Sequence, residues 1–420
     1  MKLRFITCSF VFAALNLSSH SLSAQDVAAA ESKIAEPQQK AVEKRHVSPE
    51  KGPAFTEPPK GDLDFALMGE FIGPIATDKE NEYESLGLQI RPLGHDNFQA
   101  VAYFGGLPGQ EAHRPTMTRM VGRRSGDFLI LSGGPWAIFV EKDGCLIVDR
   151  TGKNRGRLER IARVSPTMHA KAPEGAMVLF DGSNVDQFTN GQMTKDGLLE
   201  EGTDFKPMFQ DFNMHVEFLL PYMPQADGQQ RGNSGLYLQS RYECQVLDSF
   251  GTETMINGLG ALYQFKKPEL NMCFPPLVWQ TYDLHFTAPR WAADGTKVRN
   301  AHITSWINGV KVQNNVELPN KTGAGKPEEP VLLPTKLQDH GDPVRFRNIW
   351  VIDRGLTQVD TFPVLSPNEE PAVEKKAEQP AEKKKANRKN AEPKTNDAET
   401  KSEPEADEDK ADEVKQPKGE

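Results

Sequence analysis

The chain is short of apolar residues, of cysteine and of long hydrophobic runs. Only 37% of its 420 residues are hydrophobic, whereas a globular domain usually has about 45–50%, so some segments do not enter a core. Four cysteines exclude a disulfide-rich scaffold. Since no apolar run reaches about 18 residues, no membrane-spanning helix is expected. A net charge of −9 argues against general nucleic-acid binding.

The first 24 residues have the three-part pattern of a secretory signal peptide. Lys2 and Arg4 supply positive charge, residues 5–17 are mostly apolar, and small residues precede Gln25. A buried N-terminal helix is the alternative, but nothing amphipathic follows this segment. We therefore expect cleavage after Ala24 and export to the periplasm, the cell envelope or the extracellular space.

Three cysteines remain after such a cleavage, so at most one disulfide can form. Cys244 and Cys273 are the candidate pair, with Cys145 left over. The alternative is that all three are small buried residues without a covalent partner.

Two polar segments flank the middle of the chain. Residues 25–61 and 363–420 consist largely of charged residues, alanine and proline, with very few aromatic side chains. Such segments cannot bury enough apolar area to offset the entropy of ordering the chain. We expect a disordered leader and a disordered, charged C-terminal tail.

The middle of the chain is patterned mainly with period two, which predicts β-strands. The strands fall into two regions, 62–170 and 176–354, joined by a polar segment at 171–175. Asp143 with Gly144 in the first region, and Asn308 with Gly309 in the second, are typical of tight hairpin turns. We predict an all-β chain, in which a small β domain precedes a two-sheet β-sandwich.

Polar residues interrupt the strands of the second region in a regular way. Glu243 and Gln245 alternate with Tyr242, Cys244 and Val246, so one face of that strand is polar and the other apolar. Such a face is either an ordinary solvated surface or a surface for polyhydroxylated ligands, which need amides, carboxylates and aromatic rings.

The residues around this strand extend the pattern. Tyr237 projects to the same side as Glu243 if the strand is unbroken, and a polar turn before it can present Asn233. Near the end of the region, a turn at 338–341 precedes a strand in which Arg347 lies opposite Phe346. No nucleophile elbow, P-loop, dinucleotide fingerprint or zinc motif occurs.

A series of motifs in the second region resembles the 3-keto-disaccharide hydrolase domain family. The motifs are LFDGS at 179–183, GNSGLY at 232–237, RYECQVLD at 241–248, GALY at 260–263, WQTYD at 279–283, APR at 288–290, NG at 308–309 and LQDHGDPVRFRNI at 337–349. The resemblance implies a concanavalin A-like sandwich and activity on 3-keto-glycosides. Phe188, where the family usually has Trp, and Cys244 and Cys273 are departures from the family pattern. The first region resembles a β module that precedes this domain in some bacterial secreted proteins.

The implied chemistry starts from a ketone at C3 of the sugar, which acidifies the C2 proton. A base removes this proton, the group on C1 is eliminated, and water can add back, so that the net result is hydrolysis. The resemblance makes Glu243 and His340 the candidate base and acid. The candidate substrate-binding residues are Asn233, Tyr237, Gln245, Tyr263, Gln338 and Arg347.

Several further expectations follow from this resemblance. A divalent cation could bind through Glu243, Asp248 or His340, although no metal-ligand spacing is present. The expected partner is an oxidoreductase that makes the keto sugar. We predict that Glu243, Gln245, His340 and Arg347 converge on one face of one sheet. The alternatives are a non-catalytic carbohydrate-binding module and a structural envelope protein, because the fold does not fix the function.

Overall fold

The computed structural model describes residues 47–48, 51–110 and 116–356. The predicted signal peptide, most of the leader and the charged tail lie outside the described residues. Almost all regular structure in the described part is β-strand, which confirms the predicted all-β class. The helical elements there are α2 (Leu63–Leu67) and a short 3-10 helix (Gly228–Gln230). No helix of the described part has the length and apolar character needed to cross a membrane.

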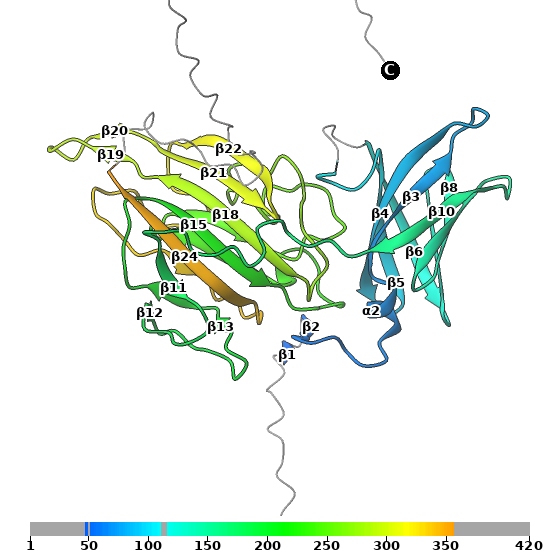
Figure 1. Cartoon of the computed structure of the whole chain (residues 1–420), viewed down its shortest axis with the longest axis horizontal. Helices are drawn as coiled ribbons and strands as arrows, with labels where there is room; N and C mark the ends of the chain where they lie inside the picture. The colour runs from blue at the N-terminus through cyan, green and yellow to red at the C-terminus, as the bar shows by residue number, and fades with distance from the viewer. Residues whose placement is uncertain (1–46, 49–50, 111–115, 357–420) are drawn as a thin grey trace, which may run out of the picture. The chain divides into compact units, whose positions relative to one another are not determined.

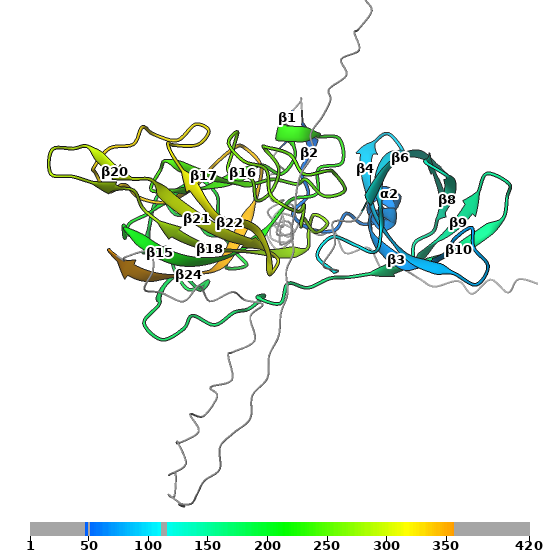
Figure 2. The same ribbon diagram turned by 90° about the horizontal axis from the view of Figure 1, so that it is seen from above.

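The first β region is a closed barrel of eight antiparallel strands (Figure 2). Each strand pairs with the next one along the chain, and the last strand closes the barrel on the first. Phe71, Leu88 and Ile138 are fully buried in the interior, as expected where alternate residues point inward. The strands are β3 (Gly69–Ala76), β4 (Tyr83–Gly94), β5 (Asn97–Phe104), β6 (Thr116–Ser125), β7 (Phe128–Gly133), β8 (Trp136–Val140), β9 (Gly144–Asp149) and β10 (Asn154–Ile161).

The second β region contains two sheets. Figure 1 shows β24, β15, β18 and β21 of the larger sheet side by side. The larger sheet has seven strands in the order β11-β24-β15-β18-β21-β22, with β13 added to β24. Its strands are β11 (Met177–Phe180), β13 (Leu199–Glu200), β15 (Asp211–Leu219), β18 (Trp279–Thr287), β21 (Ala301–Ile307), β22 (Val310–Leu318) and β24 (Arg345–Gly355). The smaller sheet has five strands in the order β12-β14-β23-β16-β17. Its strands are β12 (Phe188–Thr189), β14 (Thr203–Phe205), β16 (Ser234–Leu238), β17 (Tyr242–Val246) and β23 (Lys336–Leu337).

Two short strand pairs stand apart from these sheets. One is β19 (Arg290–Trp291) with β20 (Lys297–Arg299), and the other is β1 (Val47–Ser48) with β2 (Gly52–Pro53). Asn308 and Gly309, at φ 51° and 76°, form the two-residue turn between β21 and β22, which confirms the predicted hairpin.

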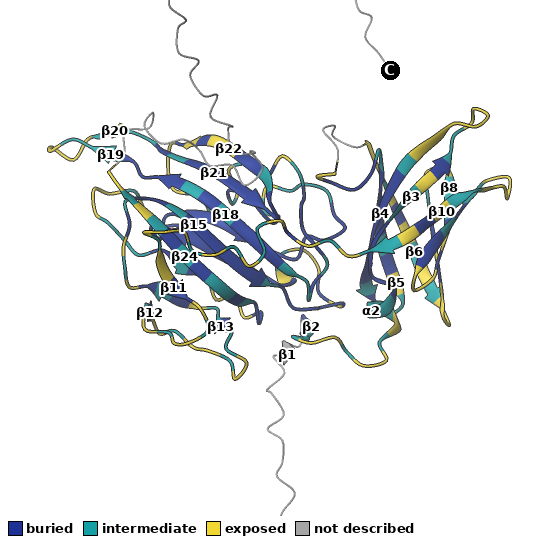
Figure 3. Ribbon diagram, in the orientation of Figure 1, coloured by how far each residue is buried: buried dark blue, intermediate teal, exposed yellow. Residues whose placement is uncertain are grey.

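One hydrophobic core is shared by the two sheets of the sandwich. Cys244 and Val246 of β17 are fully buried, together with Val216 of β15 and Phe346 of β24. Figure 3 shows that much of β15, β18 and β21 is buried. The alternation predicted for β17 is therefore confirmed on its apolar side. The three cysteines of the described residues are all free and buried, so the candidate pair Cys244 and Cys273 forms no disulfide and the alternative holds.

The end of the predicted leader is ordered. Residues 51–61 are described, and Phe55 forms a β-bridge with Tyr222 of the sandwich. Ala54 is buried against Met223 and Ala226. Sequence composition alone could not show this, because a short polar segment becomes ordered when a folded surface already offers it backbone partners.

Candidate active site

Three neighbouring strands of the smaller sheet present a polar face that points away from the core. The strand register places Tyr237 of β16 opposite Glu243 of β17 on one side and opposite Lys336 of β23 on the other. In the next position along these strands, Gly235 lies opposite Gln245. Since residues directly opposite each other share a face, these side chains form one continuous polar surface.

Two loops cover this surface and bury its carboxylate. The backbone N–H of Glu243 donates to the Thr322 hydroxyl at 2.6 Å, and the N–H of Tyr263 donates to the Glu243 carbonyl at 3.1 Å. Gly323, at φ 52°, has no room for a side chain because a Cβ would collide with Glu243 Oε2 and the Tyr263 ring. As a result, Glu243 is only 3% exposed.

The environment of Glu243 makes it a candidate general base. Burial raises the pKa of its carboxyl above the ordinary value, and the Tyr237 hydroxyl, the Ala324 N–H and the Lys336 ammonium only partly offset this effect. Its Oε2 has no hydrogen-bond partner among the described residues. Burial and the neighbouring Glu243 also raise the pKa of Tyr237, so Tyr237 keeps its proton beside the carboxylate.

The side-chain amides of this face donate hydrogen bonds to neighbouring side chains, while two of their oxygens have no donor. Gln245 Nε2 donates to Asn233 Oδ1 at 2.9 Å, and Gln338 Nε2 donates to the Tyr237 hydroxyl at 3.3 Å. Gln245 Oε1 and Gln338 Oε1 are buried without a partner in the described part of the chain. An unpaired buried acceptor costs about 1–3 kcal/mol, and the hydroxyl groups of a bound ligand would supply the missing donors.

The glycine at position 235 lets two side-chain oxygens approach the backbone of β16 closely. A Cβ at Gly235 would lie 3.1 Å from Gln338 Oε1 and 3.4 Å from Glu243 Oε1. Since Gly235 has no such atom, the Gln338 and Glu243 oxygens can both lie close to the strand backbone at this position. The arrangement therefore combines a buried base, a protonated phenol, a cation and hydroxyl acceptors, as proton abstraction from a polyhydroxylated ligand requires.

Arg347 does not belong to this site. It lies on β24 in the larger sheet, where its Nε donates to Glu217 Oε2 at 2.7 Å and its guanidinium stacks over the Trp279 ring at 3.8 Å. The predicted convergence of Arg347 with Glu243 is therefore wrong. The chain passes from the smaller to the larger sheet between β23 and β24. Alternation shows which face of a strand a residue occupies, but it does not show which sheet the strand joins.

Lys336 is the cation that sequence reasoning missed. Its ammonium lies 4.8 Å from the centre of the Tyr237 ring, on the face that carries Glu243. The only signal in the sequence is its position beside Leu337, which is buried in the core.

His340 lies in an exposed turn, and its backbone carbonyl accepts a hydrogen bond from Lys51 Nζ at 3.0 Å. No hydrogen bond or ion pair joins its imidazole to Glu243 in the part of the chain that the structure describes, and the convergence of His340 with Glu243 stays a prediction. Asp248, the remaining metal candidate, accepts from Arg231 Nε at 2.6 Å in a buried ion pair. Across residues 47–48, 51–110 and 116–356 there is no group of three His, Cys, Asp or Glu side chains placed to hold a metal ion.

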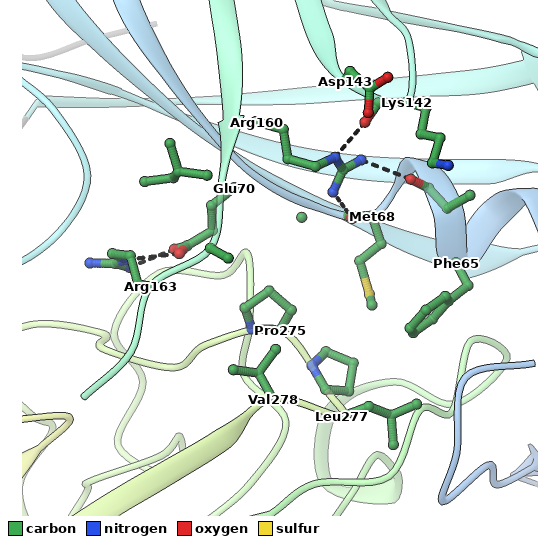
Figure 4. Close-up of a pocket in the computed structure, with 15 residues that line it drawn as sticks. Phe65, Met68, Glu70, Lys142, Asp143, Arg160, Arg163, Pro275, Leu277 and Val278 are labelled. Carbon is green, nitrogen blue, oxygen red and sulfur yellow. Dashed lines mark hydrogen bonds and ion pairs between the residues drawn. The ribbon is translucent and has the colours of Figure 1, made fainter. Parts of the chain in front are cut away.

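A separate cavity of about 560 Å³ lies beside strands β3 and β10 (Figure 4). Its arginines are already paired: Arg160 donates to the Ala66 and Met68 carbonyls at 2.8 and 2.6 Å, and Arg163 binds Glu70 through two hydrogen bonds. Pro275, Leu277 and Val278 form much of the opposite wall. Because its buried charges are satisfied, this cavity is a weaker candidate for chemistry than the Glu243 face.

Comparison with known proteins assigns the sandwich to a family. Residues 175–352 match the family described as the 3-keto-alpha-glucoside-1,2-lyase-like domain. A candidate glycosyl hydrolase from Parabacteroides distasonis is 32% identical, in a match that covers 43% of this chain and 84% of that one with a TM-score of 0.40. This chain belongs to the 3-keto-alpha-glucoside-1,2-lyase-like family. The predicted resemblance is thereby confirmed.

The family match spans the sandwich and leaves the barrel outside it. A second candidate glycosyl hydrolase from the same organism is 19% identical, covering 46% of this chain and 98% of that one with a TM-score of 0.32. No curated protein matches the chain. Family membership supports a glycan-processing enzyme.

Proposed function

We propose that this chain is an exported enzyme that cleaves or hydrates 3-keto-glycosides. The observation that carries the proposal is the buried Glu243 carboxyl, whose pKa is raised, beside Tyr237 and Lys336 on one face of the smaller sheet. Export is supported by the signal-peptide pattern of the first 24 residues.

Glu243 takes the role of the base. A raised carboxyl pKa brings this group closer to the operating pH, where it accepts a proton from C2 more effectively. Negative charge then develops on the C3 oxygen, and the ammonium of Lys336 is the cation on this face that can stabilise it. Tyr237, which keeps its proton, donates to the departing group on C1.

The remaining residues bind the sugar. Gln245 Oε1 and Gln338 Oε1 have no donors in the described structure and accept from sugar hydroxyls. Asn233 fixes the orientation of Gln245, and the half-buried Tyr263 offers its ring to a C–H face of the sugar. An oxidoreductase must act before this enzyme, because a C3 ketone forms by oxidation of the C3 hydroxyl.

The second candidate function is a carbohydrate-binding module without catalysis. The same unpaired acceptors would bind hydroxyls whether or not a proton is transferred. The two functions differ in their dependence on the carboxylate, because binding alone does not require a base.

The experiment uses p-nitrophenyl 3-keto-glucoside and follows nitrophenol release by the full-length protein. Release is expected from the keto substrate and not from unoxidised p-nitrophenyl glucoside, whose C2 proton is not acidic. Exchange of the C2 proton for solvent deuterium would show that this proton is removed before the bond at C1 breaks. Saturable binding without release would favour the binding module, and neither release nor binding would contradict both functions.

A further inference from the structure

Residues 51–55, here called the N-terminal strap, are attached to the sandwich by backbone and side-chain contacts. Phe55 and Tyr222 exchange two backbone hydrogen bonds, each of 2.9 Å. Ala54 is buried with Met223 and Ala226. The strap is thus held in a fixed position, although it belongs to a segment whose composition predicts disorder.

The strap places a buried cation next to the loop that follows β23. Lys51 Nζ donates to Asp342 Oδ1 at 2.8 Å and to the His340 carbonyl at 3.0 Å. The side chains of Lys51 and Asp342 are 11% and 0% exposed. Because a buried carboxylate without a partner is strongly unfavourable, the ion pair with Lys51 stabilises the Asp342 side chain in this position.

Asp342 connects the strap to the candidate active site. Its second oxygen, Oδ2, accepts from the backbone N–H of Asn233 at 2.8 Å. The side chain of Asn233 in turn accepts from Gln245 Nε2 at 2.9 Å through its Oδ1. Three successive contacts therefore lead from Lys51 to Gln245, whose Oε1 is buried and has no hydrogen-bond partner among the described residues.

We propose that Lys51 is a positioning residue for substrate binding, acting through Asp342 and Asn233. The ion pair with Lys51 holds the Asp342 carboxylate in position, and this fixes the backbone of Asn233 and the direction of the Gln245 amide. The proposal rests on the proposed function in so far as Gln245 binds the sugar. The coupling of the strap to Asn233 is a property of the fold and holds independently of the reaction.

The first test compares Lys51→Met with Lys51→Arg and with Lys60→Met in the full chain. Lys60 is an exposed lysine close to the strap, so its substitution controls for the loss of a positive charge.

Hydrogen–deuterium exchange is read in peptides that contain Asn233 and in peptides from the barrel. Loss of a buried charged contact is expected to speed exchange about tenfold at Asn233 in Lys51→Met, and Lys51→Arg and Lys60→Met should match the wild type. Equal acceleration in the barrel peptides, or none at Asn233, would overturn the coupling.

Kinetics distinguish positioning from general stability. Lys51→Met should raise KM for the keto substrate about tenfold with a smaller change in kcat, whereas partial unfolding would lower kcat and leave KM unchanged. If the wild type binds the sugar without turnover, the Kd from calorimetry replaces KM. If it neither binds nor turns over, the proposed function fails, and the exchange experiment still decides whether the strap is coupled to Asn233. An unchanged KM or Kd alongside faster exchange would overturn the role in substrate binding.

A second pair of variants tests the route through Asp342. In Lys51→Met/Asp342→Asn the buried charge is removed, while the amide oxygen can still accept from the Asn233 N–H. In Lys51→Met/Asp342→Leu no acceptor remains. We expect the first double variant to recover most of the wild-type exchange and KM, and the second to recover neither; equal behaviour of the two would overturn the proposed route.

Discussion

Replacing Glu243 with Gln should greatly lower the activity without weakening the fold. The side chain keeps nearly the same volume but can no longer accept a proton, and losing one acid–base group typically lowers the rate about 10²–10⁴-fold. This loss corresponds to an increase of about 3–5 kcal/mol in the activation barrier. The measurement is kcat/KM for release of nitrophenol from p-nitrophenyl 3-keto-glucoside.

The structure also predicts whether Glu243→Gln raises or lowers the stability of the fold. Burial raises the pKa of Glu243, and its Oε2 has no partner in the described structure. The charged form is therefore unfavourable in the folded state. Below the carboxyl pKa of the unfolded chain, Glu243 is protonated in both states and causes no penalty. As the pH rises through the raised folded pKa, the wild type loses stability that Glu243→Gln keeps. The variant should be at least as stable as the wild type at pH 8.

Glu217→Gln is the matched control, because the same substitution then falls on the larger sheet. Burial disfavours the charge of Glu217, but hydrogen bonds from His215, Asn348 and Arg347 and from the His169 N–H lower its pKa from 4.5 to about 2. The control should lose about 3 kcal/mol of stability at neutral pH and retain its kcat/KM per folded molecule. The full difference in stability from the wild type should be seen above about pH 4.5. The difference should become smaller as the pH falls toward 2.

Two results would refute this reasoning. Full activity of Glu243→Gln on the keto substrate would show that the carboxylate is not the base. A lower melting temperature than the wild type at pH 8 would show that the charged form of Glu243 stabilises the fold, contrary to its unpaired oxygen.

Three further predictions concern the same face and its supports. Tyr237→Phe should lower kcat about 10–100-fold with little change in the melting temperature, because only the hydroxyl beside Glu243 is removed; equal kcat values would contradict its role as a proton donor. Lys336→Met should shift the acidic limb of the kcat/KM–pH profile to higher pH, since Lys336 lowers the pKa of Glu243; an unshifted limb would show that the ammonium does not act on the base. A chain that begins near Pro173 should fold, because the sandwich has its own core. That chain should melt at a lower temperature and show a raised KM, since it lacks Lys51; an unchanged KM would contradict the role of the strap.

Local features of the site could be predicted from the sequence because they depend on short stretches of chain. Alternation placed Glu243 and Gln245 opposite the core residues Cys244 and Val246, and the structure confirms this arrangement. The family motifs likewise predicted the sandwich. For residues on one strand, or on strands joined by a short connection, the two-residue period of a strand largely determines which side chains share a face.

Relations between distant segments were decided only by the tertiary structure. Arg347 has the predicted alternation with Phe346, yet it lies on the other sheet, because the choice of sheet depends on which strands pair over long distances. The burial of Glu243 depends on a loop that contains Gly323, about 80 residues further along the chain.

Lys51 shows the same limit most clearly. Its partner Asp342 is 291 residues away in the sequence, and nothing local distinguishes Lys51 from the other lysines of the leader. The sequence by itself determined the strands, their buried and polar faces and the family. The assignment of strands to sheets, the cation beside the base and the contact of the strap with the site were decided by packing, because these depend on contacts between segments that the chain brings together only on folding.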